Sequence, residues 1–471
     1  MLFNSHSFIL FFLGVLLIHH CPLPWRAKKF NLLVASNLFY AAWNPPFIFL
    51  LWYSIVLDWF VGRALANSTS HKVRRALLAA TLVSNLGLLA AFKYGGFILE
   101  NLSLLLGWAG IGYPSWKLEI LLPVGISFYT FQSLSYTIDI YRGEIKPCRS
   151  FLGFALFVSF FPQLEAGPIV RAREFLPQLD SPRVANREDL AIGVLLFILG
   201  LFMKVVVADA IMAPVAEKVF DSLTRPEGLI CWSGVLAFTI QIYCDFGGYS
   251  ACAIGLARCL GFRLPRNFWF PYGAVGFSDF WRRWHISLSS WLRDYVYIPL
   301  GGNLDGTVAL GRNIMLTMLI GGLWHGAAWH FVVWGALHGI LLLLERLLRA
   351  TVIPILDLPK SVNEALGWVL TFAGLLVTWI YFRADSAARA AIILKGLVHP
   401  MQATERVEGS MLLPLVISPL IVIGQFAVRN TTLAGIAGRC PAWLLVSLVS
   451  GMLVSLVVLS GNSRAFIYFQ F

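Results

Sequence analysis

Charged residues are scarce in this sequence. Asp, Glu, Lys and Arg make up 13% of its 471 residues, whereas hydrophobic residues make up 58%. A soluble globular chain carries about twice that charged fraction. This composition excludes a soluble globular protein and indicates that lipid, rather than water, surrounds most of the chain.

The sequence also lacks the patterns of a disulfide scaffold or a metal site. None of its seven cysteines belongs to a Cys-x-x-Cys pair, and most of them stand in or beside apolar runs. Such cysteines are typically small buried hydrophobic residues. The histidines show neither HxxxH nor HExxH spacing, so we expect no bound metal.

No linker, internal repeat or low-complexity segment separates the apolar runs, which predicts a single membrane-embedded domain over residues 1–471. The net charge of +12 could indicate nucleic-acid binding. The basic residues, however, stand in short clusters at the ends of apolar runs, as Arg26, Lys28 and Lys29 do, and charges that orient membrane spans show this pattern. We therefore expect a lipid bilayer, and no nucleic acid, as a partner.

Long apolar runs recur along the whole chain. A bilayer core about 30 Å thick needs roughly 20 helical residues, and these runs have that length or are slightly shorter. They include residues 190–207, 229–242, 331–344, 366–381, 412–426 and 443–459. We predict an all-α polytopic membrane protein with about 10 or 11 transmembrane helices, plus short re-entrant or interfacial helices. Residues 30–61, with Pro45 and Pro46 at their centre, read as a tight hairpin or a re-entrant pair.

The central third of the chain, residues 241–339, combines charged, aromatic, glycine and histidine residues at predicted membrane depth. Such residues are costly in lipid and usually serve a site. Glycines at 321, 322 and 326 predict a break in the helical backbone, which is tolerated there only inside protein or beside a watery cavity. We expect the active site in this region.

The first candidate segment runs from residue 278 to residue 295. At helical spacing Trp281, His285, Leu288 and Leu292 share one face, which predicts an amphipathic helix with a histidine on its apolar side. Two interpretations stay open: a core histidine beside arginines that anchor lipid headgroups, or a histidine at a reaction channel beside arginines that bind donor phosphates. On the second interpretation the phosphate ligands are Arg282, Arg283 and Arg293.

The second candidate segment, Gly321 to His330, places His325 between glycines, where backbone can approach a substrate closely. A neutral imidazole is the usual general base, so His325 is the candidate base for a hydroxyl that attacks a thioester. Alternatively, His325 packs between helices and the glycines merely permit close helix contact. For His330 and His338, a packing or hydrogen-bonding role is the expectation.

The third candidate segment holds Asp245 between apolar runs. An intramembrane Asp is expected to have a partner or a task, and we expect an arginine or a histidine as that partner. Structural ion pairing explains Asp245 equally well. We assign Asp245, Tyr249, Trp324 and Trp281 as residues that support the site or line its substrate channel.

Taken together, these segments resemble the membrane-bound O-acyltransferase superfamily, and most closely its bacterial branch typified by alginate O-acetyltransferase. The similarity covers nearly the whole chain and several segments agree in order. The matching residues are 122–132, 161–164, 166–171, 243–246, 248–250, both histidine segments and the closing 466–471. Two positions depart from the family pattern: Glu165 stands where an apolar residue is usual, and Ala251 where an acidic residue is common.

The resemblance implies that the family's catalytic histidine is His325 and that the second functional histidine of the bacterial branch is His285. It also implies a helical fold around a central channel, a thioester donor such as acetyl-CoA reached from the cytoplasm, and acyl delivery to the outer face of a bacterial inner membrane. No permanently bound cofactor is expected.

The expected reaction is O-acetylation of an exopolysaccharide such as alginate, directly or through periplasmic acetyltransferase or acyl-carrier partner proteins. Cellulose, teichoic acid and peptidoglycan are alternative acceptors. A proton-coupled transporter is the rival from another class, because many spans with buried Asp, Glu and His also describe such carriers. That rival predicts corresponding broken segments in two halves of the chain, and the sequence shows none.

Overall fold

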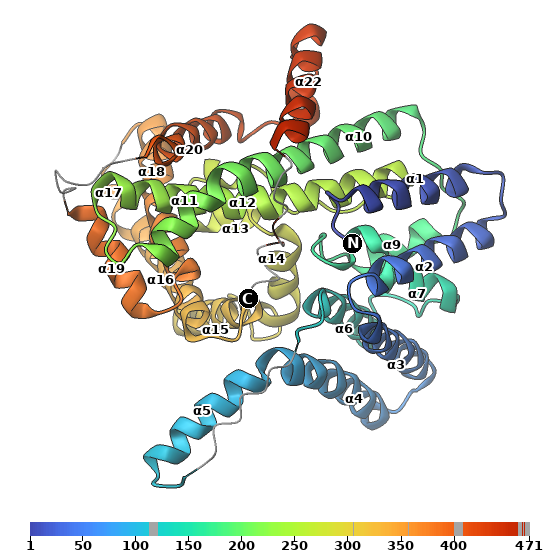
Figure 1. Ribbon diagram of the computed structural model, residues 1–471. Helices are drawn as coiled ribbons and strands as arrows, with labels where there is room; N and C mark the ends of the chain where they lie inside the picture. Colours follow the sequence, from blue (N-terminus) through green and yellow to red (C-terminus); the bar gives the residue numbers. More distant parts are fainter. Residues whose placement is uncertain are drawn as a thin grey trace. The chain divides into compact units, whose positions relative to one another are not determined.

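The computed structural model describes residues 1–112, 121–304, 306–356, 358–399 and 408–459, together with Arg464 and Phe466. Within these residues every regular element is helical, and nine helices are long and apolar enough to cross a membrane, beside the shorter apolar helix His6–His20. Helices satisfy their own backbone hydrogen bonds in lipid, where no water is available. The all-α polytopic membrane protein predicted from the sequence is therefore confirmed (Figure 1).

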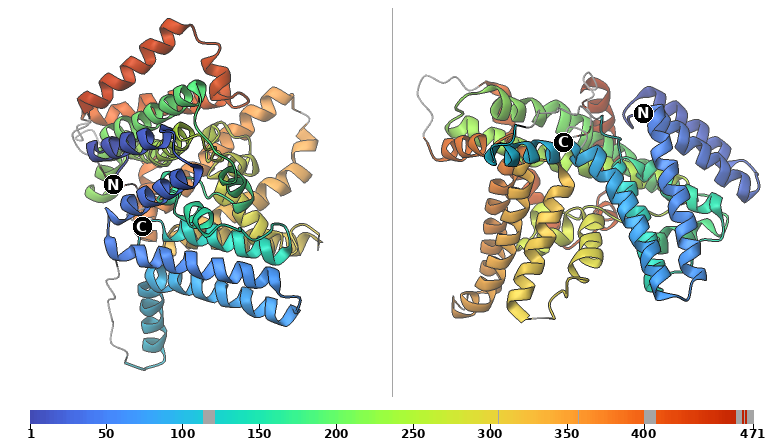
Figure 2. Two further views of the ribbon diagram at one scale, coloured as in Figure 1. Left: turned by 90° about the vertical axis from the view of Figure 1, so that its right-hand side faces the viewer. Right: turned by 90° about the horizontal axis from the view of Figure 1, so that it is seen from below.

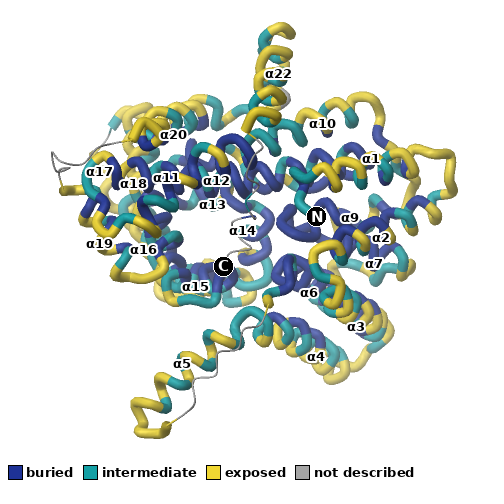
Figure 3. The backbone as a smooth tube through the Cα atoms, viewed as in Figure 1, coloured by how far each residue is buried: buried dark blue, intermediate teal, exposed yellow. Residues whose placement is uncertain are grey.

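Two helices show how this chain meets lipid. Neither α5 (Gly95–Trp108) nor α22 (Ala442–Leu459) has a buried residue (Figure 3). The side chains exposed on them are largely apolar, such as Leu104, Val446 and Val457. An exposed apolar helix of this kind is stable in the hydrocarbon of a bilayer and would be costly in water.

The chain forms two compact units. The first unit comprises residues 1–197 and 252–265, and the second comprises 198–251 and 266–471. Helices of the first unit are α1 (His6–His20), α2 (Trp25–Ala41), α3 (Ile48–Asn67), α4 (His71–Leu89), α5, α6 (Ile126–Arg142), α7 (Phe151–Ser159), α8 (Phe161–Leu164) and α9 (Ala172–Leu179). The single domain expected over residues 1–471 stays a prediction.

The first unit is built around α6, most of whose residues are buried against α3 and α4 (Figures 1 and 2). The expected hairpin over residues 30–61 is present, because α2 and α3 are joined by a short turn at Pro45–Phe47. Proline lacks the N–H that continues a helix, so the pair of prolines fixes where the chain reverses.

A buried carboxylate ties α3, α4 and α6 together. Asp58 on α3 accepts hydrogen bonds from the hydroxyl of Thr81, from the Asn85 amide at 3.1 Å and from the Thr137 hydroxyl at 3.0 Å. All four side chains are at most 1% exposed. These bonds replace water for a group that would otherwise be expensive to bury.

Helices α10 (Arg187–Leu201) and α12 (Gly228–Cys259) run from one unit into the other. After α10 the chain remains helical: a π-helical segment Phe202–Met212 is followed by α11 (Ala213–Glu217) and by a second π-helical segment, Lys218–Ser222. The remaining helices of the second unit are α13 (Phe277–Arg283), α14 (Ile286–Leu292), α15 (Gly306–His325), α16 (Trp329–Thr351), α17 (Ile353–Leu356), α18 (Lys360–Arg383), α19 (Ala387–Val398), α20 (Gly409–Val428), α21 (Leu433–Ala437) and α22.

In the second unit α15 and α16 form a tight hairpin whose helices lie side by side (Figure 2). A Cβ added to Gly322 would clash with the carbonyl oxygen of Phe331, and one added to Gly335 would clash with that of Met318. The break that we predicted between Gly321 and Gly326 is present but lies at its far end, because α15 continues through Gly321 and Gly322 to His325. Gly322 and Gly335 let α15 and α16 touch, and the chain leaves the helix only over residues 326–328.

Candidate active site

His285 lies at a break between two short helices. We expected one amphipathic helix through His285, and that expectation is wrong: α13 ends at Arg283 and α14 begins at Ile286. His285 itself has φ 42° and ψ 54°, the left-handed conformation. That conformation interrupts a right-handed helix, and it is uncommon outside glycine, although histidine, like Asn and Asp, adopts it more often than most residues.

A preceding segment of chain pairs with the backbone on both sides of this break. The N–H of Ile286 donates to the carbonyl of Asn267 at 2.9 Å, and the N–H of Trp269 donates to the carbonyl of Arg283 at 2.9 Å. Periodicity alone could not reveal the break, because the pairing residues come from another part of the chain.

His325 is the last residue of α15 and is 3% exposed. Its ring packs at 4.9 Å from Trp334, 5.0 Å from Trp324 and 5.4 Å from Phe382, measured between ring centroids. The indole of Trp334 comes from α16, and the ring of Phe382 comes from α18. The tight α15–α16 hairpin thus places the imidazole among aromatic rings that exclude water.

The break and the hairpin bring the two histidines together. The imidazole rings of His285 and His325 are 6.4 Å apart between centroids, and Trp324 packs against both, at 5.4 Å from His285. Phe246 of α12 covers His285 from 4.6 Å. Burial lowers the pKa of His285 to about 3, so this ring is neutral near pH 7.

Asp245 belongs to a buried ion cluster. Its carboxylate lies 2.6 Å from the ammonium of Lys204, which also contacts Asp209 at 2.9 Å. All three side chains are less than a tenth exposed. One partner is therefore a lysine, whereas we expected an arginine or a histidine. Buried charges persist only when paired in this way.

The other supporting residues occupy different places. Trp324 contacts both histidines, whereas Trp281 packs 5.0 Å from His338 and 5.8 Å from Trp334. Tyr249 is buried and its ring lies 5.2 Å from Phe466. Trp324 thus lies directly at the histidine pair, while Trp281 packs against Trp334 and His338.

His338 was expected to pack or to hydrogen-bond. It is fully buried, stacks on Phe280 at 6.0 Å and lies 4.7 Å from Trp334. Within the described residues neither of its ring nitrogens has a hydrogen-bond partner. The packing role is the one that these contacts support.

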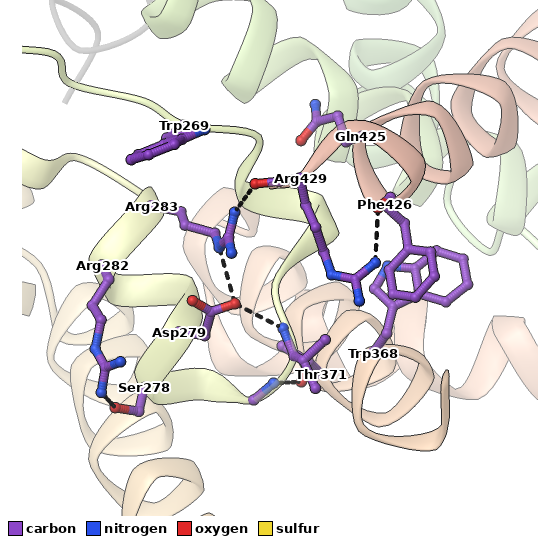
Figure 4. Close-up of polar contacts among 12 residues, drawn as sticks. Trp269, Ser278, Asp279, Arg282, Arg283, Trp368, Thr371, Gln425, Phe426 and Arg429 are labelled. Atoms are coloured by element: carbon purple, nitrogen blue, oxygen red, sulfur yellow. Dashed lines mark hydrogen bonds and ion pairs between the residues drawn. The ribbon is translucent and has the colours of Figure 1, made fainter. Parts of the chain in front are cut away.

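The three arginines proposed to bind donor phosphates differ in their exposure and in their contacts within the protein. Arg283 is half-buried, pairs with Asp279 at 2.9 Å and donates to the carbonyl of Arg429 at 2.8 Å (Figure 4). Arg282 is exposed and reaches the hydroxyl of Ser278 at 3.3 Å (Figure 4). Arg293 is exposed and pairs with Asp294 at 2.7 Å. Arg282 and Arg293 are thus more available to an external phosphate than Arg283.

Sequence reasoning passed over two residues of this region. Lys204 lies inside the apolar run of residues 190–207, and an intramembrane lysine is a visible signal for a charged partner. Asn267 carries no such signal, because its contacts with the α13–α14 break are made only in the folded chain.

The two departures from the expected family pattern lie in different surroundings. Glu165 follows α8 in the first unit and is 3% exposed. Ala251 lies within α12 and is half-buried.

Comparisons with known proteins place these residues in a wider group. A model of the membrane-bound O-acyltransferase family matches residues 144–360. A probable alginate O-acetylase of Azotobacter vinelandii is 42% identical over 387 residues, 82% of this chain and 76% of that protein. A peptidoglycan O-acetyltransferase of Helicobacter pylori is 38% identical over 84% of this chain and 80% of its own. A teichoic acid D-alanyltransferase of Bacillus subtilis is 26% identical over 72% of this chain and 87% of its own. Both His285 and His325 lie inside the segment that the family model matches.

Proposed function

The chain belongs to the membrane-bound O-acyltransferase family and is a multi-pass membrane enzyme, and on that premise we propose that it acetylates an exopolysaccharide such as alginate. The donor is a cytoplasmic thioester, acetyl-CoA or a related acyl thioester, and the acetyl group crosses the bacterial inner membrane. The 42% identity to a probable alginate O-acetylase supports this choice of acceptor.

The single observation that supports the chemistry is the histidine pair, 6.4 Å apart in a buried aromatic cluster. His325 takes the proton of the acceptor hydroxyl as its oxygen bonds to the thioester carbonyl carbon. The C–S bond then breaks, and His325 returns the proton to the departing thiolate. The neutral ring of His285 donates a hydrogen bond to the carbonyl oxygen, where negative charge develops.

The surrounding rings serve the same reaction. Trp324, Trp334 and Phe382 pack on His325 and keep bulk water from competing with the acceptor hydroxyl for the thioester. Arg282 and Arg293, the two exposed arginines, bind the phosphates of the donor, because a guanidinium fork matches phosphate oxygens. Arg283, the last residue of α13, supports them by bonding to Asp279 and to the carbonyl of Arg429 at the end of α20.

Peptidoglycan is the second candidate acceptor, because the Helicobacter pylori relative that carries this name is 38% identical over 84% of the chain. For either polymer, the acetyl group passes directly or through periplasmic acetyltransferase or acyl-carrier proteins. The donor half of the reaction is the same in both cases.

Incubation of the purified protein with radiolabelled acetyl-CoA tests the proposal. We expect release of CoA and label on an added alginate oligomer or on a co-purified partner protein. The matched variants are His325→Ala, which should abolish both signals, and His330→Ala, which should retain them. CoA release with label on peptidoglycan fragments alone would select the second acceptor, and absence of CoA release from the wild type would refute acetyl-CoA as donor.

A further inference from the structure

The residue at the start of α14 does not perform the usual task of its position. The first residues of a helix leave N–H groups without partners, and the side chain of the N-cap residue normally accepts from one of them. His285 is the N-cap of α14, yet its side chain makes no such hydrogen bond. Its ring lies instead against Trp324, 5.4 Å away between centroids.

Asn267 performs the capping task from outside the helix. Its side-chain oxygen accepts from the hydroxyl of Ser287 at 2.8 Å and from the N–H of Ser287 at 3.3 Å, and its carbonyl accepts from the N–H of Ile286 at 2.9 Å. Asn267 is 1% exposed. Asn267 thus accepts three hydrogen bonds from the first turn of α14 and holds that turn in place.

The left-handed backbone at His285 depends on such support. Within the described residues only His285 and Phe270 combine a side chain with a positive φ. His285 lies in the break, and Phe270 directly follows the segment Asn267–Trp269 that pairs across it. Sparsely populated conformations persist only when their surroundings over-determine them, and they gather at functional sites. Without Asn267, the chain from α13 to α14 would be free to relax toward an ordinary helix, which would swing the imidazole away from His325.

We propose that Asn267 is the positioning residue that holds the α13–α14 break and thereby aims the ring of His285 at His325. This inference rests on the proposed role of His285 in acyl transfer. It assigns Asn267 no contact with donor or acceptor. It predicts that substitutions at Asn267 act on turnover through His285 and leave donor affinity unchanged.

Three substitutions distinguish the effect of losing the hydrogen-bond acceptor of Asn267 from the effect of changing side-chain volume. Asn267→Leu keeps the volume and removes the acceptor, whereas Asn267→Asp keeps an oxygen at the same place. Ser287→Ala removes one of the two bonds to that oxygen and tests the same contact with little risk to folding. Asn85→Leu is the matched control, because Asn85 is also 1% exposed but bonds Asp58 in the first unit.

The measurements are kcat and donor KM with acetyl-CoA, and hydrogen exchange of the peptide that covers residues 284–290. We expect Asn267→Leu to lower kcat by up to about 100-fold, the effect of a small misplacement of a reacting group. Ser287→Ala should cost up to about tenfold, and Asn267→Asp should retain most activity. Exchange at Ile286 and Ser287 should accelerate in Asn267→Leu and stay unchanged in Asn85→Leu.

A double-mutant cycle decides whether the effect passes through His285. In a His285→Ala background, Asn267→Leu should cause little further loss, because the ring that it positions is already gone. The same loss in both backgrounds, or faster exchange with unchanged kcat, would overturn the inference. A wild-type rate in His285→Ala would also overturn it while leaving His325 and the proposed function standing. If the wild type transfers nothing from acetyl-CoA, the proposed function fails. Hydrogen exchange then still tests whether Asn267 stabilises the α13–α14 break: faster exchange in Asn267→Leu supports this, and unchanged exchange overturns it.

Discussion

Two buried polar centres of this protein differ in what surrounds them. In the first unit, Asp58 accepts hydrogen bonds from Thr81, Asn85 and Thr137. In the second unit, His285 and His325 lie among Trp324, Trp334, Phe246 and Phe382. Short polar side chains surround one centre, and large aromatic rings surround the other.

This difference separates a structural role from a chemical one. Hydroxyl and amide donors compensate the buried carboxylate and tie three helices to each other, so Asp58 contributes to stability. Aromatic rings exclude water from the second centre, so an acceptor hydroxyl beside His325 would not compete with bulk water for the thioester. We therefore expect substitutions at the first centre to change folding and substitutions at the second to change turnover.

The largest effect is expected for His325→Ala. Loss of a general base typically lowers the rate about 100- to 10,000-fold, whereas the thermal unfolding midpoint should stay close to that of the wild type. The measurement is CoA release by purified protein together with its thermal unfolding in detergent. Near-normal release would refute the proposed base, and a collapse of stability would place His325 with Asp58 among the structural residues.

The next effect is expected for His285. Loss of one preorganised donor commonly costs about 2.7–4 kcal/mol of transition-state stabilisation, so His285→Ala should be strongly impaired. His285→Gln keeps a donor and should retain more activity. His285→Asn should fold better than the Gln variant, because asparagine tolerates the left-handed conformation found at this position.

Rates for the three variants with the same donor decide between roles of His285. Equal and complete inactivation by all of them would indicate an essential proton transfer. Wild-type rates in all of them would make His285 a buried packing residue.

A smaller effect, and one of a different kind, is expected for Asp58→Ala. The variant removes the carboxylate that Thr81, Asn85 and Thr137 share as an acceptor, which should lower the free energy of unfolding by about 1–3 kcal/mol. The activity of each folded molecule should not change. Unfolding curves and specific activity of the folded fraction test this, with Asp58→Asn as the milder control. A normal stability with a reduced kcat would contradict the separation of the two centres.

The smallest effect is expected at the arginines beside the histidine centre. Arg282→Gln should raise the apparent KM for acetyl-CoA about tenfold, since a charge-assisted hydrogen bond is worth about 1.5–3 kcal/mol. Arg283 pairs with Asp279 and the Arg429 carbonyl, so Arg283→Gln should mainly lower the thermal unfolding midpoint. Initial rates over a range of donor concentrations distinguish these outcomes. An unchanged donor dependence in both variants would assign the arginines to headgroup anchoring.

Much of the fold could be predicted because lipid imposes strict rules on sequence. The apolar runs predicted the helices, and Pro45 and Pro46 predicted the reversal between α2 and α3. The histidine segments drew attention to His285 and His325, which the structure then brought within 6.4 Å of each other. The conformation of His285 could not be predicted, because helical spacing assumes that the helix continues.

By itself the sequence determined that lipid surrounds the chain, that its regular elements are helices and which residue types are available for acyl transfer. These properties follow from composition and from spacing along the chain. The tertiary structure decided which groups meet. Lys204 pairs with Asp245, and Gly322 allows the backbone of α16 to approach α15 closely. Asn267 accepts a hydrogen bond from Ser287, 20 residues later in the sequence. Such contacts join segments that are distant in sequence, and their energies depend on packing and burial that no local pattern records.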